Sequence, residues 1–119
     1  MSESQTGDIL LVEDSPADVE LAEEVFHEIE NFSVTLHVVE DGEKALEYLR
    51  NPERDIPDLI ILDLDLPRMD GFEVLRELDG DPDLGMVPVI VLTMSNADED
   101  ISRAYEFGAN ACITKPLGF

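Results

Sequence analysis

The chain alternates between short runs of apolar residues and longer segments in which apolar residues recur every three or four positions. Short apolar runs bounded by polar or turn residues are typical of strands that are buried on both faces of a parallel sheet. The longer segments have the spacing of helices that bury one face. The runs predict five strands, at Asp8–Val12, Val34–Val39, Leu59–Leu62, Val89–Leu92 and Ala111–Thr114.

Helices are predicted between these strands. The first begins near Ser15, which is suited to cap a helix, and Pro16, which suits the first helical position. Its inward face is expected to carry Val19, Ala22, Val25, Phe26 and Ile29. Later helices are predicted over Glu43–Arg50, Gly71–Asp79 and Asp98–Phe107, with Ala45, Leu46, Leu49, Phe72, Leu75 and Leu78 facing the core.

This alternation predicts an α/β fold, a five-stranded doubly wound parallel sheet with helices on both faces. At 119 residues the chain is long enough for one domain with a single core. We expect residues 8–119 to form that domain. Residues 1–7 are small or polar apart from the initial methionine, and they are expected to be a disordered tail.

Charge narrows the range of functions. The chain has 29 acidic and 7 basic residues, which gives a formal net charge of −22. Nucleic-acid binding is disfavoured, because neutralising phosphates requires clustered Lys and Arg. Yet 44% of the residues are apolar and periodically placed, so we predict a folded domain with an acidic surface, as in proteins of salt-loving organisms.

Two further features of the sequence indicate where in the cell the protein is expected. No apolar run approaches the ~20 residues needed to span a bilayer, so no membrane segment is expected. The single cysteine, Cys112, cannot form an internal disulfide and fits a reducing environment. We therefore expect a soluble protein of the cytoplasm.

Chemically reactive residues stand at the ends of four of the five predicted strands. Glu13 and Asp14 follow the first strand, Asp63 the third, Thr93 the fourth and Lys115 the fifth. The carboxyl ends of parallel strands meet along one edge, where open α/β sheets bind their ligands. Each residue alone could be a solvated strand end, but their recurrence predicts a common site.

That site would gather Glu13, Asp14, Asp63 and Asp65 near Lys115. Clustered carboxylates stay ionised only if something compensates, so either a pKa rises or a divalent cation binds. An open loop edge with few protein oxygens favours Mg²⁺ that keeps several waters over a caged Ca²⁺. The lysine ammonium and a threonine hydroxyl suit phosphoryl oxygens, so the parts for phosphoryl transfer onto an aspartate are present.

In these residues the chain resembles the receiver domains of two-component response regulators, and the resemblance covers essentially its whole length. It rests on Glu13-Asp14, on Asp63 in Asp-Leu-Asp-Leu-Pro-Arg-Met-Asp-Gly, on Thr93 in Val-Leu-Thr-Met-Ser, and on Lys115-Pro116. Segments such as Ser-Pro-Ala-Asp look most like stand-alone regulators that partner phytochrome-type histidine kinases. The resemblance implies a flavodoxin-like sheet with strand order 2-1-3-4-5.

The resemblance also implies a role for each site residue. Asp63 would accept the phosphoryl group from a phosphohistidine of a histidine kinase. Asp14, Asp63 and the main-chain oxygen of Asp65 would ligate Mg²⁺, with Glu13 acting through water. Thr93 and Lys115 would hold the phosphoryl oxygens. The protein would then be a signalling module and not an enzyme with an external substrate, acting through an unidentified downstream protein, with a homodimer left open.

Three features depart from the family pattern. Cys112 stands where the family usually has Tyr or Phe, and it is expected either to change how the signal is passed or only to pack in the core. Met94 replaces a smaller residue and is expected to screen the phosphoryl group from water. The sequence ends at Phe119, so the last helix expected after Lys115-Pro116 is missing from it.

Two other classes of function compete with this one. Asp-Leu-Asp after an apolar strand also resembles the aspartate-nucleophile, Mg²⁺-dependent phosphatases. Their pattern, however, lies on the opening strand and has Thr or Val where Pro67 stands here. A pseudo-receiver used only as an interaction scaffold would be expected to have lost the acidic pair, the acceptor or the lysine, and all of them are present.

The net charge predicts how stability depends on salt. Salt at about 1 M shortens the Debye length to about 3 Å, so it should relieve repulsion across the acidic surface. We expect the melting temperature, followed by circular dichroism, to rise by at least ~5 °C between roughly 0.1 M and 1 M salt. A melting temperature that does not change with salt would contradict the interpretation of a salt-adapted surface.

Overall fold

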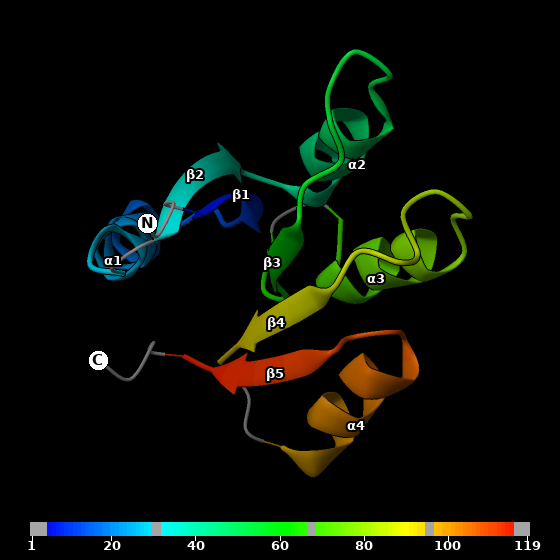
Figure 1. The fold of residues 1–119 in the computed structure, drawn as a ribbon. Helices are drawn as coiled ribbons and strands as arrows, with labels where there is room; N and C mark the ends of the chain where they lie inside the picture. The colour runs from blue at the N-terminus through cyan, green and yellow to red at the C-terminus, as the bar shows by residue number, and fades with distance from the viewer. Residues whose placement is uncertain (1–4, 30–31, 67–68, 95–96, 116–119) are drawn as a thin grey trace.

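The computed structural model describes residues 5–29, 32–66, 69–94 and 97–115 of the chain. Within these ranges strands and helices alternate (Figure 1). The strands are β1 (Gln5–Val12), β2 (Phe32–Val39), β3 (Leu59–Asp63), β4 (Val89–Thr93) and β5 (Ala111–Thr114). The helices are α1 (Pro16–His27), α2 (Gly42–Arg50), α3 (Gly71–Asp79) and α4 (Asp98–Glu106).

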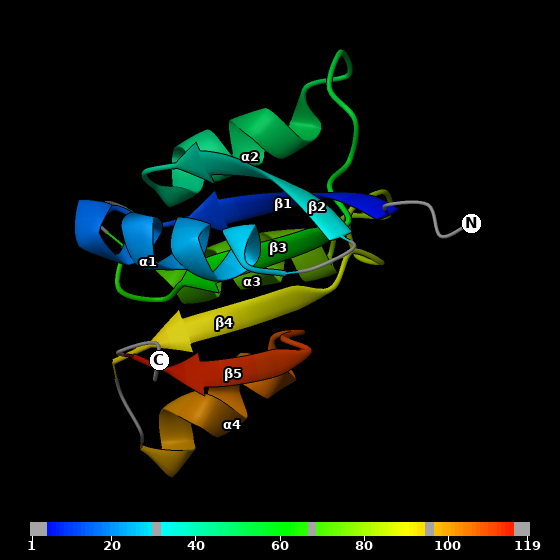
Figure 2. The same cartoon turned by 60° about the vertical axis from the view of Figure 1, so that its left-hand side comes forward.

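The five strands form one parallel sheet in the order β2-β1-β3-β4-β5, which confirms the predicted fold and strand order. β1 lies between β2 and β3, where Val12 pairs with Val39 on one side and with Leu62 on the other. The strands all point the same way (Figure 2). Their carboxyl ends therefore lie along a single edge of the sheet, as the sequence predicted.

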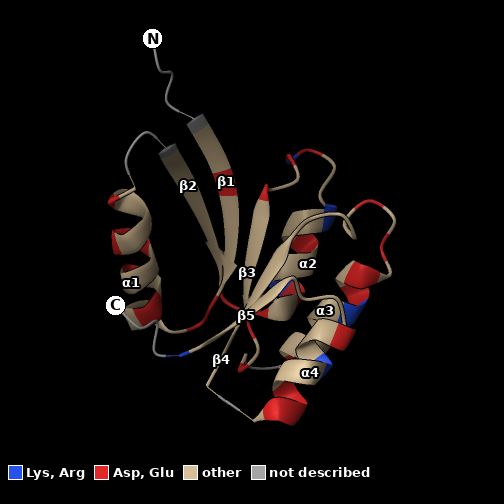
Figure 3. Ribbon diagram, turned by 60° about the horizontal axis from the view of Figure 1, so that its bottom comes forward, with Lys and Arg blue, Asp and Glu red and all other residues tan. Residues whose placement is uncertain are grey.

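The sheet separates two apolar layers. α1 lies on one face of the sheet, and α2, α3 and α4 lie on the other (Figure 3). Successive strand residues point to opposite faces, so Leu10 joins the larger layer beneath α2, α3 and α4, and Leu11 joins the smaller layer beneath α1. Because both faces of the inner strands are buried, these strands read as continuous apolar runs in the sequence.

Polar side chains fix where three of the described helices begin. The Ser15 Oγ accepts a hydrogen bond from the Asp18 N–H at 3.4 Å at the start of α1. Asp41 and Asp70 cap α2 and α3 in the same way, each over a distance of 2.9 Å. These caps lie close after strand ends, so the helix N-termini gather at the same edge of the sheet as the reactive residues.

The first two strands begin earlier than the sequence predicted. Gln5, Thr6 and Gly7 belong to β1 and pair with Phe32, Ser33 and Val34 of β2, so these three residues are not part of a disordered tail. Main-chain pairing needs no apolar side chain, which is why the polar sequence gave no signal. The rest of the predicted tail, residues 1–4, lies outside the described residues.

The ends of two helices also differ from the prediction. α1 ends at His27, so Ile29 lies beyond the helix and is exposed to solvent, whereas it was expected on the inward face. α4 ends at Glu106, one residue earlier than predicted, and Gly108 follows with a φ of 106°, a left-handed conformation that favours glycine. Phe107 caps the helix and packs edge-on against Phe72 at 5.9 Å between ring centroids.

No helix in the described part of the chain has both the length and the apolar character required to cross a membrane. The predicted absence of a last helix concerns the segment after Lys115, and residues 116–119 are outside the described ranges. Pro67, which distinguished the chain from the phosphatase pattern, also lies outside them.

The contact between Gly71 and the end of β3 generates a stability prediction. A Cβ on Gly71 would lie 2.6 Å from the Leu64 Cα and 3.0 Å from the Asp63 main-chain oxygen. Gly71→Ala should therefore lower the free energy of unfolding by roughly 1–3 kcal/mol in a denaturant titration. Gly80→Ala is the matched control, because its Cβ would meet the Arg76 oxygen at an ordinary 3.5 Å. Equal effects of the two substitutions would contradict this packing.

Candidate functional site

The structure places the predicted site residues along one edge of the sheet. Glu13 and Asp14 directly follow β1, Asp63 and Thr93 are the last residues of β3 and β4, and Lys115 follows β5. Glu13 and Asp63 are each only 1% exposed, and Thr93 is also buried. Buried carboxylates need hydrogen bonds and charge compensation, so this end of the sheet is chemically unlike an ordinary solvated strand end.

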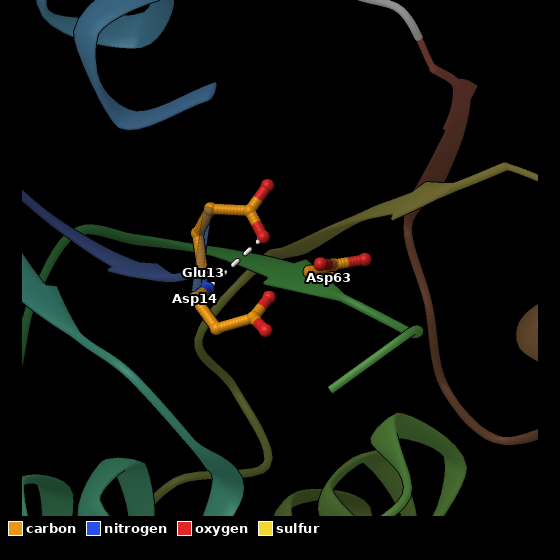
Figure 4. Close-up of side chains that lie close together, drawn as sticks. All are labelled: Glu13, Asp14 and Asp63. Carbon is orange, nitrogen blue, oxygen red and sulfur yellow. Dashed lines mark hydrogen bonds between the residues drawn. The ribbon is translucent and has the colours of Figure 1, made fainter. Parts of the chain in front are cut away.

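Three of the carboxylates form a compact group. Glu13, Asp14 and Asp63 each offer an oxygen, and these oxygens all lie within 4.8 Å of one another. Figure 4 shows the group where β1 and β3 end, with the Asp14 N–H donating to a Glu13 carboxylate oxygen at 3.1 Å. Asp14 is exposed and the other two are buried, so the group is open to solvent on one side. A hard divalent cation prefers such oxygen ligands and would fit this group.

Lys115 joins the carboxylates through its ammonium group. The Nζ donates to a Glu13 oxygen at 2.5 Å, to an Asp63 oxygen at 3.0 Å and to an Asp18 oxygen at 3.0 Å. The Lys115 side chain is 8% exposed. An ammonium group has three N–H donors, so these three carboxylates use its full donor capacity.

Burial and hydrogen bonding shift the pKa values of this cluster. Burial, followed by the hydrogen bond to Asp63, raises the pKa of Glu13 to about 8, although Lys115 opposes the rise. Burial works against the charge of Lys115, but its hydrogen bonds to the carboxylates outweigh burial and raise its pKa. The hydrogen bond from Lys115 lowers the pKa of Asp18.

The acceptor loop is tied to the neighbouring strand end. One Asp63 carboxylate oxygen accepts a hydrogen bond from the Asp65 N–H at 3.0 Å, and the other accepts one from the Lys115 Nζ. The Asp65 side chain in turn accepts a hydrogen bond from the Met94 N–H at 3.1 Å. Asp65 was predicted to contribute its main-chain oxygen, and its side chain has this additional role of joining the segments after β3 and β4.

Asp18 is the site residue that the sequence reasoning missed. It is not among the predicted site residues, yet its carboxylate contacts Lys115. Its place in the first turn of α1 was the available signal, because that turn follows the end of β1 at the reactive edge. The partner, 97 residues away in the sequence, gives no local sign of the contact.

Met94 and Cys112, the two substitutions relative to the family pattern, have different surroundings. The Met94 side chain is 71% exposed, which argues against the predicted screening of a phosphoryl group. Cys112 is partly buried, packs against the larger apolar layer, and has a thiol pKa raised by burial. Its packing agrees with the core role considered for it, and its part in signalling stays a prediction.

A depression opens beside the site. It has a volume of about 450 Å³ and is lined by Leu64, Asp65, Leu66, Asp70, Phe72, Thr93 and Asp100. Thr93 thus lies between the buried carboxylates and this depression. The arrangement combines buried carboxylates, a buried lysine ammonium group and an open depression at one edge of the sheet.

Comparisons with known proteins agree with this geometry. The model of the response regulator receiver domain family matches residues 9–119. The chain is 42% identical over 113 residues to Response regulator Rcp1 of Synechocystis sp., covering 90% of this chain and 75% of Rcp1.

Solved structures give the same result. The Mn²⁺-bound form of Rcp1 aligns with a TM-score of 0.87 and 39% identity over 95% of this chain and 84% of Rcp1. The phosphorylated cyanobacterial phytochrome response regulator RcpA aligns with a TM-score of 0.84 and 40% identity, covering 95% and 83% of the two chains.

The raised pKa of Glu13 predicts how stability varies with pH in the absence of metal. In the unfolded chain Glu13 loses its proton near pH 4.5, whereas the folded protein retains it to about pH 8. The contribution of this proton to stability is fully present below pH 4.5 and is lost as pH rises to 8. In thermal unfolding with EDTA, the melting temperature should therefore decrease over this window, and Glu13→Gln should flatten the decrease.

The control for this measurement is Glu20→Gln, which removes an exposed carboxylate of α1 and should keep the wild-type slope. It accounts for the general effect of removing one negative charge from the acidic surface. Identical slopes for the wild type and Glu13→Gln would show that Glu13 is ionised in the folded protein at neutral pH.

Proposed function

This chain belongs to the response regulator receiver domain family, and we propose that Asp63 is its phosphoacceptor. One observation carries the assignment: the Asp63 carboxylate is buried at the end of β3, within 3.0 Å of the Lys115 Nζ and in the same acidic group as Glu13 and Asp14. Receiver homologues of this kind act in phosphorylation-dependent signalling, and this chain is a signalling module of the same type.

The transfer step uses groups that are already in position. An oxygen of the Asp63 carboxylate attacks the phosphorus of a kinase phosphohistidine, the P–N bond breaks, and the imidazole leaves as an acyl phosphate forms on Asp63. Lys115 stabilises the negative charge on the phosphoryl oxygens, and the Thr93 hydroxyl is the second donor proposed for them. The depression beside Thr93 gives the donor access.

The acidic group is the proposed metal site. Asp14, Asp63 and the main-chain oxygen of Asp65 would hold Mg²⁺, with Glu13 acting through water. The cation would neutralise charge on the phosphoryl oxygens. The Mn²⁺-bound form of Rcp1 supports a divalent cation here, and we propose Mg²⁺ because both ions favour oxygen ligands in open sites.

Receiver domains of this family partner histidine kinases. We propose a phytochrome-type kinase as the donor, supported by the likeness to the phytochrome response regulator RcpA, and an unidentified protein as the downstream target. We also propose that the protein works in a cytoplasm of high salt, which the net charge of −22 supports. Self-phosphorylation and dephosphorylation would then be its only catalysis.

Phosphorylation of Asp63 can be measured directly. Incubation with acetyl phosphate and Mg²⁺ should add one phosphoryl group per chain by intact-protein mass spectrometry, and EDTA or Asp63→Asn should abolish the addition. Asp83→Asn, an exposed carboxylate in the loop after α3, is the matched control and should be phosphorylated like the wild type.

Two results would contradict the proposal. A phosphoryl group that persists in Asp63→Asn would place the acceptor elsewhere. Continuous release of product from a phosphomonoester, with many turnovers per chain, would support the aspartate-nucleophile phosphatase.

A further inference from the structure

We propose that Asp18 is a positioning residue for phosphoryl transfer, holding the Lys115 ammonium next to Asp63. The inference rests on the proposed function of Asp63 and extends it to a residue outside the expected set. Its basis is the 3.0 Å hydrogen bond from the Lys115 Nζ to an Asp18 carboxylate oxygen, which joins the first turn of α1 to the end of β5.

Asp18 differs from the other two partners of Lys115. Glu13 and Asp63 both belong to the acidic group that could hold a cation, whereas among the described residues Asp18 is not a member of that group. A cation bound there would compete with Lys115 for Glu13 and Asp63. The bond to Asp18 is free of this competition, so it keeps Lys115 in place whether or not the metal site is loaded.

The carboxylate of Asp18 is itself held on a rigid element. The Asp18 N–H donates to the capping Ser15 Oγ, and α1 packs on the sheet through Ala22 and Phe26. A negative charge in the first turn is also favoured by the helix dipole. Lys115, by contrast, has a flexible side chain and follows the last strand, so it gains most from a fixed partner.

The apolar surroundings strengthen this constraint. A cavity of about 210 Å³ lies between α1 and the sheet, lined by apolar residues that include Ala22, Phe26, Ile61 and Ile113, with Asp18 and Glu13 at its boundary. Asp18 therefore contacts Lys115 at the edge of an apolar space. Among the described residues that line this cavity, Glu13 and Asp18 are the charged ones, and both accept a hydrogen bond from Lys115.

Asp18 could instead compete with the phosphoryl group for Lys115, and the donor count argues against that role. One N–H of Lys115 already points to an Asp63 oxygen, and it can pass to a phosphoryl oxygen on Asp63. The bond to Asp18 uses a different N–H, so it need not break. Asp18 should therefore assist phosphorylation and not oppose it.

The contact can be tested without any activity measurement. The chain has two lysines, Lys44 and Lys115, so a protein labelled with ¹⁵N at the lysine side chains gives at most two ammonium signals. Asp18→Asn should shift or broaden the Lys115 signal and leave that of Lys44, which lies on α2, unchanged. Glu20→Gln removes a neighbouring exposed charge on α1 and should change neither signal.

The functional test compares phosphorylation with metal binding. With acetyl phosphate and saturating Mg²⁺, Asp18→Asn should lower the phosphorylation rate of the protein about tenfold. Mg²⁺ affinity measured by calorimetry should not fall, because Asp18 lies outside the acidic group. Asp18→Glu should recover most of the rate, and Glu20→Gln should match the wild type.

Several outcomes would overturn the inference. An unchanged phosphorylation rate in Asp18→Asn would show that the Asp18–Lys115 contact has only a structural role. A faster rate would show that Asp18 competes with the phosphoryl group for Lys115. A parallel loss of Mg²⁺ affinity would place Asp18 in the metal site. These outcomes can be distinguished from a failure of the proposed function of Asp63, because in that case the wild-type chain itself would not be phosphorylated.

Discussion

The Lys115 ammonium is the interaction on which the reactive edge of this protein depends. It is shared among three carboxylates that come from the end of β1, the first turn of α1 and the end of β3. Two buried acids so close together would repel each other strongly without a cation between them. The positive charge of Lys115 therefore stabilises the buried carboxylates at the end of the sheet. It offsets the burial of Glu13 only in part, since the pKa of Glu13 is still raised.

The parallel sheet is what brings these groups together. The strands pair in parallel, so the chain must cross over between them, and every strand of the sheet ends at the same edge. The inner strands are buried by apolar layers on both faces. Residues separated by 52 and 102 positions then meet at one ammonium group. The hydrophobic pattern thus fixes the position of the site, and the polar residues at the strand ends determine its chemistry.

This division explains what could be predicted from the sequence. The inner strands and the positions of Asp63 and Lys115 followed from apolar runs and parallel topology. The start of β1 at Gln5 did not, because main-chain pairing with β2 leaves no side-chain signal. Asp18 was missed because its contact requires α1 and β5 to be placed in space, and the exposure of Met94 depends on a loop conformation that periodicity does not encode.

The close approach of Gly71 to Leu64 has a mechanical consequence. A Cβ at Gly71 would lie 2.6 Å from the Leu64 Cα, so no free volume separates the segment after Asp63 from the start of α3. Close-packed contacts of this kind transmit displacement and do not absorb it. A shift of the backbone beside Asp63 would therefore displace the N-terminal end of α3, and α3 would move as a rigid body.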